Sequence, residues 1–410
     1  MVEGSFYDQV DELAQYLDTV NQTPGVLSGE LAPLAEREEK DEMVRKLVNA
    51  SSALSQAPEK EFIPSYNLLI HLVRPSPLLP ELLPIILNNL STPPPSSPIN
   101  GPALVLSILT TIFNVLPPTS KLRSTVLQII LKIISAHGLY EVLNPQLKNL
   151  DRWFSEWNST NEEVRSILVA VADIAEEASD YEQFYNSLLS TLHQFSTAEA
   201  SSPAARTVAV RLVKAAISLP NRLDFDDLIA LDSVQALAKS DPELFNLLEV
   251  FAGGDLEDYE EFNDINENWL EDNGLSHPAL LRKIRLLTLA SLSTRTPTRS
   301  LPYKAISKAL HIPSDDVEMW VIDVIRAGLV EGKLSQLNQT FLIHRSSYRV
   351  FGLDQWLEVS DRLEVWKGTL RGILDVIRAS RESVEGHAKG EREEADRKLE
   401  GVARAVEVDA

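Results

Sequence analysis

Histidine is the side chain that most often binds a metal or moves a proton near neutral pH. The chain has seven, which are His71, His137, His193, His277, His311, His344 and His387. No two of them have the H-x-H or H-E-x-x-H spacing that places two imidazoles on one metal ion. The absence of cysteine also excludes disulfides, thiolate catalysis and cysteine-ligated metals. The sequence therefore predicts no metal site, and we expect scattered structural histidines.

Carboxylates could serve acid–base chemistry or bind cations, and they are densest in "FAGGDLEDYEEFND", at residues 255–264. This segment lacks the spacing of oxygen ligands that a calcium loop requires, so a solvated acidic helix is expected. The chain also lacks the glycine-rich phosphate loops and the G-x-S-x-G nucleophile motif. These absences predict a protein that is not an enzyme and has no cofactor.

Positive charge is concentrated in residues 277–351, which carry 11 Lys and Arg against 5 Asp and Glu. Residues 1–276 carry 17 against 41, and residues 352–410 carry 10 against 14. An acidic chain with one basic segment can contact phosphates or an acidic protein locally, without coating nucleic acid nonspecifically. The alternative is a solvated face that contacts neither. The candidate contact residues are Arg282, Lys283, Arg285, Arg299, Lys304 and Lys308.

The basic segment also has the element order of a winged helix. "SHPALLRKIRLLTLASLS", "PYKAISKALHI" and "PSDDVEMWVIDVIRAGLV" each read as a helix, and "LVEGKLSQ" and "QTFLIHRS" read as two short strands. In a DNA-reading winged helix the third helix would contact the bases. Here that helix is net negative, so sequence-specific DNA reading is not expected.

The rest of the chain is predicted to be mainly helical. Residues 1–276 contain helix pairs that recur every 35–45 residues or so, a period that suits an α-solenoid of stacked helical repeats. A proline-rich loop, "STPPPSSPINGP", interrupts this array at residues 91–102. Residues 381–410 read as a charged tail, disordered or loosely helical. Without a secretory signal or a membrane-length apolar run, the chain is expected in the cytoplasm.

One apolar stripe stands out in residues 352–380, which we expect to form a long C-terminal helix. Its members alternate spacings of three and four, and they are Trp356, Val359, Leu363, Trp366, Leu370, Ile373 and Ile377. The stripe is about 33 Å long, whereas a module the size of residues 277–351 is only about 25 Å across. We therefore expect the Trp356 end to complete the winged helix and the far end to pack against another chain.

A helical array that leads into a winged helix and then a long helix resembles the PCI domain family. The resemblance covers about residues 180–380, and that family is shared by the proteasome lid, the signalosome and translation initiation factor 3. The segments "VIDVIRAGLVEGKLSQ", "RVFGLDQW" and "VWKGTL" carry it most specifically, and they are similar to a PCI subunit of translation initiation factor 3. The loop at 91–102 and the tail after Arg381 match no part of the family.

The resemblance implies a non-catalytic scaffold in translation initiation, supporting recruitment of the small ribosomal subunit and mRNA. It implies lateral contacts with sibling PCI subunits through a sheet edge, here Lys333, Leu334, Phe341, Leu342 and Ile343. It also implies that the C-terminal helix joins a bundle with sibling PCI and MPN subunits. Two alternatives stay open: a PCI scaffold subunit of the signalosome or proteasome lid, and a winged-helix regulator that binds nucleic acid.

Overall fold

The computed structural model describes residues 5–23, 25–296, 298–349 and 352–408, with side chains up to residue 384 except those of 354 and 358. The chain divides into two compact units, residues 1–288 and residues 289–410. The boundary falls inside the helix α19 (His277–Arg295), shortly after the position that the change in charge predicts. One continuous helix therefore contributes to both units.

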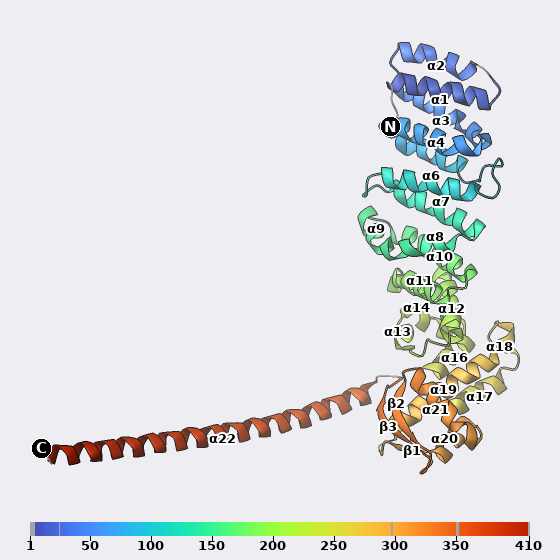
Figure 1. Ribbon diagram of the computed structural model, residues 1–410. Helices are drawn as coiled ribbons and strands as arrows, with labels where there is room; N and C mark the ends of the chain where they lie inside the picture. The colour runs from blue at the N-terminus through green and yellow to red at the C-terminus, as the bar shows by residue number, and fades with distance from the viewer. Residues whose placement is uncertain (1–4, 24, 297, 350–351, 409–410) are drawn as a thin grey trace. The chain divides into compact units, whose positions relative to one another are not determined.

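The first unit is built of helices throughout its described residues (Figure 1). The α-helices, with α19 continuing into the second unit, are α1 (Phe6–Val20), α2 (Val26–Glu36), α3 (Lys40–Ala50), α4 (Glu59–Val73), α5 (Leu79–Asn89), α6 (Gly101–Val115), α7 (Leu122–His137), α8 (Tyr140–Leu143), α9 (Leu150–Trp157), α10 (Asn161–Glu177), α11 (Tyr181–His193), α12 (Pro203–Ser218), α13 (Asp226–Ile229), α14 (Asp232–Gln235), α15 (Leu237–Ser240), α16 (Pro242–Gly253), α17 (Leu256–Ile265), α18 (Trp269–Asp272) and α19. Short 3-10 helices lie among them: η1 (Ser51–Gln56), η2 (Asn144–Asn149) and η3 (Thr197–Glu199).

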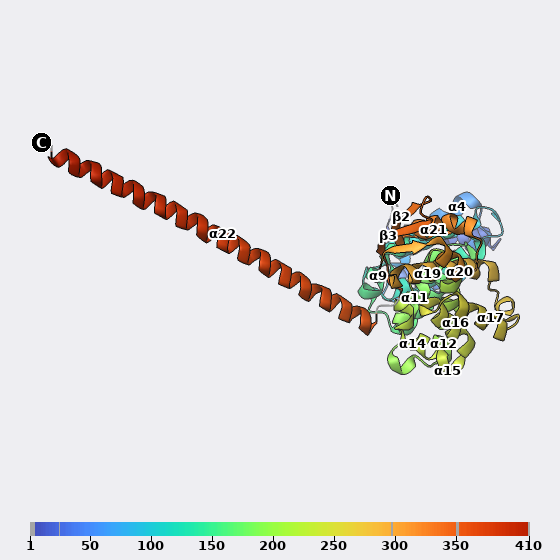
Figure 2. The ribbon, with the colours of Figure 1, turned by 90° about the horizontal axis from the view of Figure 1, so that it is seen from below.

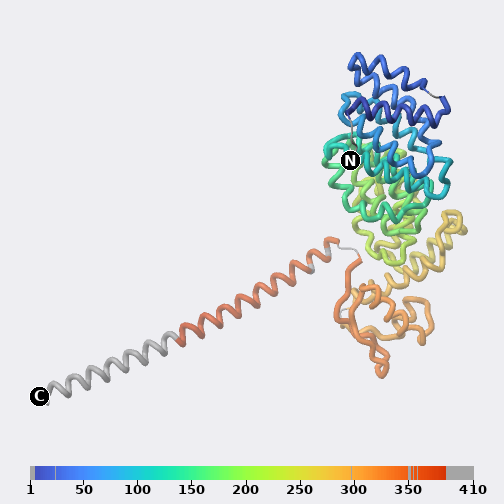
Figure 3. Tube along the Cα trace, turned by 45° about the horizontal axis from the view of Figure 1, so that its top comes forward, coloured from blue at the N-terminus to red at the C-terminus, as the bar shows by residue number. Residues whose placement is uncertain are grey.

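Neighbouring helices of this unit pack in sequence order. The helix α1 contacts α2 and α4, α4 contacts α6, and α6 contacts α7, while α10 contacts both α7 and α11. Figure 3 shows the same succession of coils from blue to green. Each amphipathic helix buries its apolar side on the next pair, and one buried cluster extends from Val10 to Ile174. The predicted array of helical repeats is confirmed.

Local signals set where these helices begin and end. Thr160 and Glu163 form a reciprocal capping box at the start of α10, which satisfies backbone donors that the first turn leaves unpaired. The helix ends before Ser179, whose φ of 61° lies in the left-handed region. The proline-rich loop predicted at 91–102 ends where α6 begins at Gly101, and in it the Ser97 hydroxyl donates to the carboxylate of Glu59 at 3.0 Å. That bond ties the loop to the start of α4.

The second unit contains a small sheet and the remaining helices (Figure 2). Its elements after α19 are β1 (Ser300–Pro302), α20 (Tyr303–Leu310), η4 (Ser314–Asp316), α21 (Val317–Arg326), β2 (Val330–Ser335), β3 (Thr340–Ser346) and α22 (Leu353–Val408). The strand order is β1-β3-β2, and both pairings are antiparallel. The winged-helix order predicted from the sequence is present, with β1 as an additional strand.

The C-terminal helix α22 begins and ends differently from its sequence-based bounds. At its start the backbone N–H of Gly352 donates to the Gln355 side-chain oxygen at 2.9 Å. The helix does not end near residue 380, where the charged tail was expected to begin, but continues to Val408. The whole charged segment up to that residue is therefore helical.

Candidate interaction surfaces

The apolar stripe of α22 is its most prominent surface feature. Spacings of three and four place the seven predicted residues on one face of the helix. Trp366 is 68% exposed, Leu370 55% and Ile373 51%, so large apolar side chains are presented to solvent. Leu374 widens the same face and is half exposed. Soluble proteins rarely leave so long an apolar face uncovered, which makes this stripe a candidate contact with another chain.

The sheet has two edge strands, β1 and β2, and the predicted edge agrees with the structure only at β2. β2 pairs with β3 on one side only, so Lys333 and Leu334 lie on an edge strand. β3 is the central strand, and its residues pair with β1 as well as with β2. The prediction that Phe341, Leu342 and Ile343 form a free edge is therefore wrong. The short strand β1 covers that side of β3, and Phe341 and Ile343 are buried in the core.

Sequence reasoning missed β1 for a physical reason. The strand is three residues long and ends in Pro302, which has no N–H to donate. Its place is set by pairing with a strand about forty residues later in the chain, in the register Ser300 with Leu342 and Leu301 with Phe341. Three residues show no alternation that periodicity could detect.

The six candidate basic residues are divided between the two units. Arg282, Lys283 and Arg285 lie on the part of α19 that belongs to the first unit, whereas Arg299, Lys304 and Lys308 lie in the second. Lys304 and Lys308 are one turn apart on α20 and both are exposed. Arg299 is also exposed and has a φ of 53°.

Lys283 lies in the core. The prediction that it contacts RNA or an acidic partner at the surface is therefore wrong. Its side chain is 3% exposed, and its ammonium donates to the carbonyl oxygens of Ala216 at 2.7 Å, Ile217 at 3.1 Å and Leu219 at 2.7 Å. These carbonyls belong to the C-terminal end of α12, which carries partial negative charge. Burial, together with the smaller effect of the positive charge of Arg222, lowers the pKa of Lys283 to about 7.

Some of the residues considered for catalysis or metal binding have contacts that stabilise the fold. The ring of His277 lies against Tyr259, with its Nδ1 2.9 Å from the tyrosine hydroxyl. In the acidic segment, Asp255 and Asp258 form a capping box that begins α17. Among the residues with described side chains, no three histidine or carboxylate groups gather at a metal-binding distance. No helix in the described ranges has the length and apolar character needed to cross a membrane.

Comparisons with known proteins agree with this architecture. The family model of the PCI domain matches residues 256–345, and the model described as "eIF3 subunit M, C-terminal helix" matches residues 349–377. Eukaryotic translation initiation factor 3 subunit M of Phaeosphaeria nodorum is 51% identical, over 98% of this chain and 93% of that protein. The subunit M proteins of Coccidioides immitis and Chaetomium globosum are 46% and 42% identical, over 93% and 94% of this chain and 88% and 89% of theirs. The chain therefore belongs to the subunit M family of eukaryotic translation initiation factor 3.

Proposed function

We propose that this chain is a non-catalytic scaffold subunit of translation initiation factor 3 in the cytoplasm. In this role it holds sibling PCI and MPN subunits together, so that the complex can recruit the small ribosomal subunit and mRNA. Family membership and the PCI domain support this role, and the exposed stripe of α22 is the observation that carries it. Such a role depends on shape and contact surfaces, and it requires no bound cofactor.

The stripe is suited to a helical bundle with sibling subunits. Fully burying one large apolar side chain contributes about 1.5–3 kcal/mol, so completing the burial of a half-exposed one contributes on the order of 1 kcal/mol. Trp356, Leu363, Trp366, Leu370, Ile373 and Ile377 are each 51–68% exposed. Together they supply enough gross free energy to hold α22 in a complex. Gly368 and Gly372 weaken the isolated helix by about 1 kcal/mol each, so partner helices would also stabilise α22 itself.

The edge strand β2 supports a lateral contact with another PCI subunit. Its backbone groups on the side away from β3 face no other strand among the described residues. An unpaired row of N–H and C=O groups is a template for a strand of another chain. Lys333 and Leu334 lie on this row, and they replace the wider edge that the sequence predicted.

The alternative functions fit less well. The relatives carry the name of initiation factor 3, which favours that complex over the signalosome and the proteasome lid. A DNA-reading regulator would present a basic third helix, but α21 carries the half-buried carboxylates Glu318 and Asp323 and a single cation, Arg326. The candidate cations that are exposed for a contact with RNA are Arg282, Arg299, Lys304 and Lys308, whereas Lys283 is buried.

The bundle role is tested by the double substitution Leu370→Asp with Ile373→Asp. We expect the variant to dissociate from sibling subunits in affinity purification followed by native mass spectrometry, because two carboxylates would have to be buried in the bundle. The matched control is Gly368→Asp with Ala379→Asp, which adds the same charge on the opposite face of α22. Circular dichroism should show the same helix content for both variants. Undiminished recovery of the complex with the stripe variant, or recovery of signalosome or lid subunits, would contradict the proposal.

A further inference from the structure

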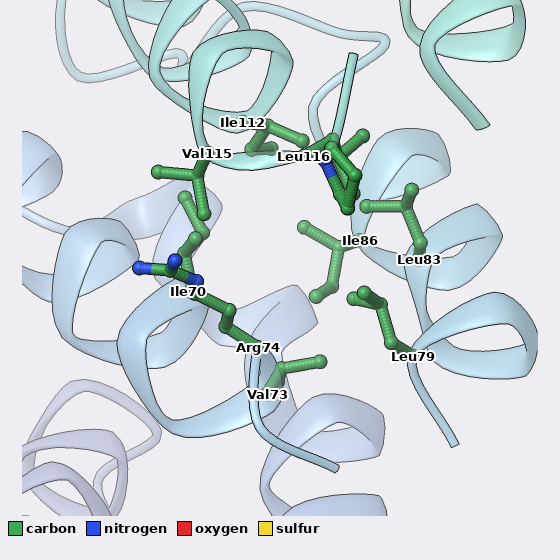
Figure 4. A pocket seen from close by; sticks show the side chains of 10 residues that line it. Ile70, Val73, Arg74, Leu79, Leu83, Ile86, Ile112, Val115 and Leu116 are labelled. Carbon is green, nitrogen blue, oxygen red and sulfur yellow. The ribbon is translucent and has the colours of Figure 1, made fainter. Parts of the chain in front are cut away.

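A hollow of about 170 Å³ lies in the first unit among α4, α5 and the end of α6 (Figure 4). Its lining residues are apolar except for Arg74. Figure 4 shows Arg74 beside Ile70 and Val115, with Leu83 and Ile86 on the other side of the hollow. We call this feature the Arg74 hollow. None of the surfaces described above includes it.

The size of the Arg74 hollow limits what can occupy it. A dry cavity of about 150 Å³ binds one benzene molecule, whereas sites for drug-sized ligands measure about 300–1,000 Å³. The hollow therefore accepts a single large apolar side chain and cannot enclose a cofactor. One buried apolar anchor in a pre-formed pit is typical of the energetic centre of a protein–protein contact.

Arg74 adds a charge at the mouth of the hollow. It follows the last residue of α4, and its backbone N–H donates to the carbonyl oxygen of Ile70 at 2.9 Å. Its guanidinium is exposed and has no hydrogen bond or ion pair with any side chain that the structure describes. A guanidinium pairs best with a carboxylate, to which it can donate two parallel hydrogen bonds. An apolar pit with one free arginine is thus complementary to an apolar group beside one carboxylate.

We propose that the Arg74 hollow binds a segment of a partner protein in which a large apolar residue is followed by a single carboxylate. The apolar side chain enters the hollow, and the carboxylate pairs with Arg74. A run of acidic residues fits poorly, because residues 1–276 carry 17 Lys and Arg against 41 Asp and Glu and would repel it. This contact is separate from the role of α22, so either proposal can fail without the other.

The test uses the full chain and a labelled peptide. The probe is a nonapeptide of glycine and serine with a central 4-fluorophenylalanine followed by aspartate, and its partner peptide has asparagine instead. Fluorine NMR line broadening during titration gives the affinity of each. We expect about fivefold tighter binding of the aspartate peptide, the effect of one solvent-exposed ion pair. Equal affinity for the two peptides, or no binding of either, would overturn the proposal.

Three variants assign the binding to the hollow. Arg74→Met keeps the aliphatic stem and is expected to remove the preference for aspartate. Val115→Trp fills the hollow from its half-buried rim and should abolish binding of both peptides. Arg37→Met is the matched control, because Arg37 is exposed and also follows the last residue of a helix, α2, but does not line the hollow. A preserved preference in Arg74→Met would refute the proposal even if Val115→Trp failed to fold.

Discussion

Replacing Lys283 with methionine is expected to destabilise the first unit substantially. Methionine has a similar length and fills the same space, but it cannot donate to the carbonyl oxygens of Ala216, Ile217 and Leu219. In a longer helix the Ala216 carbonyl would accept from residue 220, but that residue is Pro220, which has no N–H. The end of α12 therefore depends on the ammonium for its hydrogen bonds.

The expected loss in the free energy of unfolding follows from the carbonyls that lose their hydrogen-bond donor. A buried acceptor left without a partner costs about 1–3 kcal/mol. All three carbonyls lose the Lys283 donor, but the Leu219 carbonyl keeps a bond from the Arg222 N–H at 3.4 Å, so two buried acceptors are left without a partner. Methionine avoids the cost of burying a charge, which offsets part of this loss. We expect the free energy of unfolding to fall by about 2–4 kcal/mol at pH 6.

The pH dependence of the free energy of unfolding gives a second test of the role of Lys283. The folded-state pKa of Lys283 is about 7, against an ordinary lysine value of 10.5, so above pH 7 the unfolded chain holds a proton that the native chain has released. Raising the pH therefore stabilises the native state through this group, by about 1.4 kcal/mol per pH unit between pH 7 and the unfolded pKa. As the pH falls through 7 this contribution is lost. The variant lacks the group, so its deficit should widen from pH 6 to pH 9.

Urea unfolding followed by far-ultraviolet circular dichroism at pH 6, 7.5 and 9 measures both effects. Lys304→Met is the control, because Lys304 is exposed and its replacement should change the stability by no more than about 0.5 kcal/mol. A loss of less than about 0.5 kcal/mol for Lys283→Met at pH 6 would refute the hydrogen-bond argument. A deficit that stays constant between pH 7.5 and pH 9 would show that the buried ammonium keeps its proton.

Two further predictions concern the second unit. Lys304→Glu with Lys308→Glu should weaken binding of a single-stranded RNA about tenfold in a filter assay, because phosphate contacts depend on cations, while sibling subunits still co-purify. Unchanged RNA binding would identify the pair as a solvated face. Gly332→Ala should lower the free energy of unfolding by about 1–3 kcal/mol in urea, because its Cβ would collide with the Leu342 carbonyl and the Phe341 ring. A Gly332→Ala variant as stable as the wild type would show that the β-bulge at Gly332 can widen to accept the Cβ.

Several parts of this protein could be predicted from local pattern. Apolar periodicity and turn residues located α20, α21, β2 and β3, and alternating spacings of three and four located the stripe of α22. These signals work because a helix or hairpin brings residues a few positions apart onto one face, whatever the rest of the chain does. The exclusion of cysteine chemistry likewise required composition alone.

The sequence by itself determined the order of helical repeats, winged helix and long stripe-bearing helix, since each depends on neighbours along the chain. Only the tertiary structure decided that Lys283 is buried, that β3 is central and that Arg74 stands at an apolar hollow. These features arise from residues brought together across long separations, such as Lys283 with Ala216. Burial then changes the chemistry of a charged side chain, because removal from water disfavours its charged form. Lys283, which the sequence placed among the surface cations, is therefore a hydrogen-bond donor in the core.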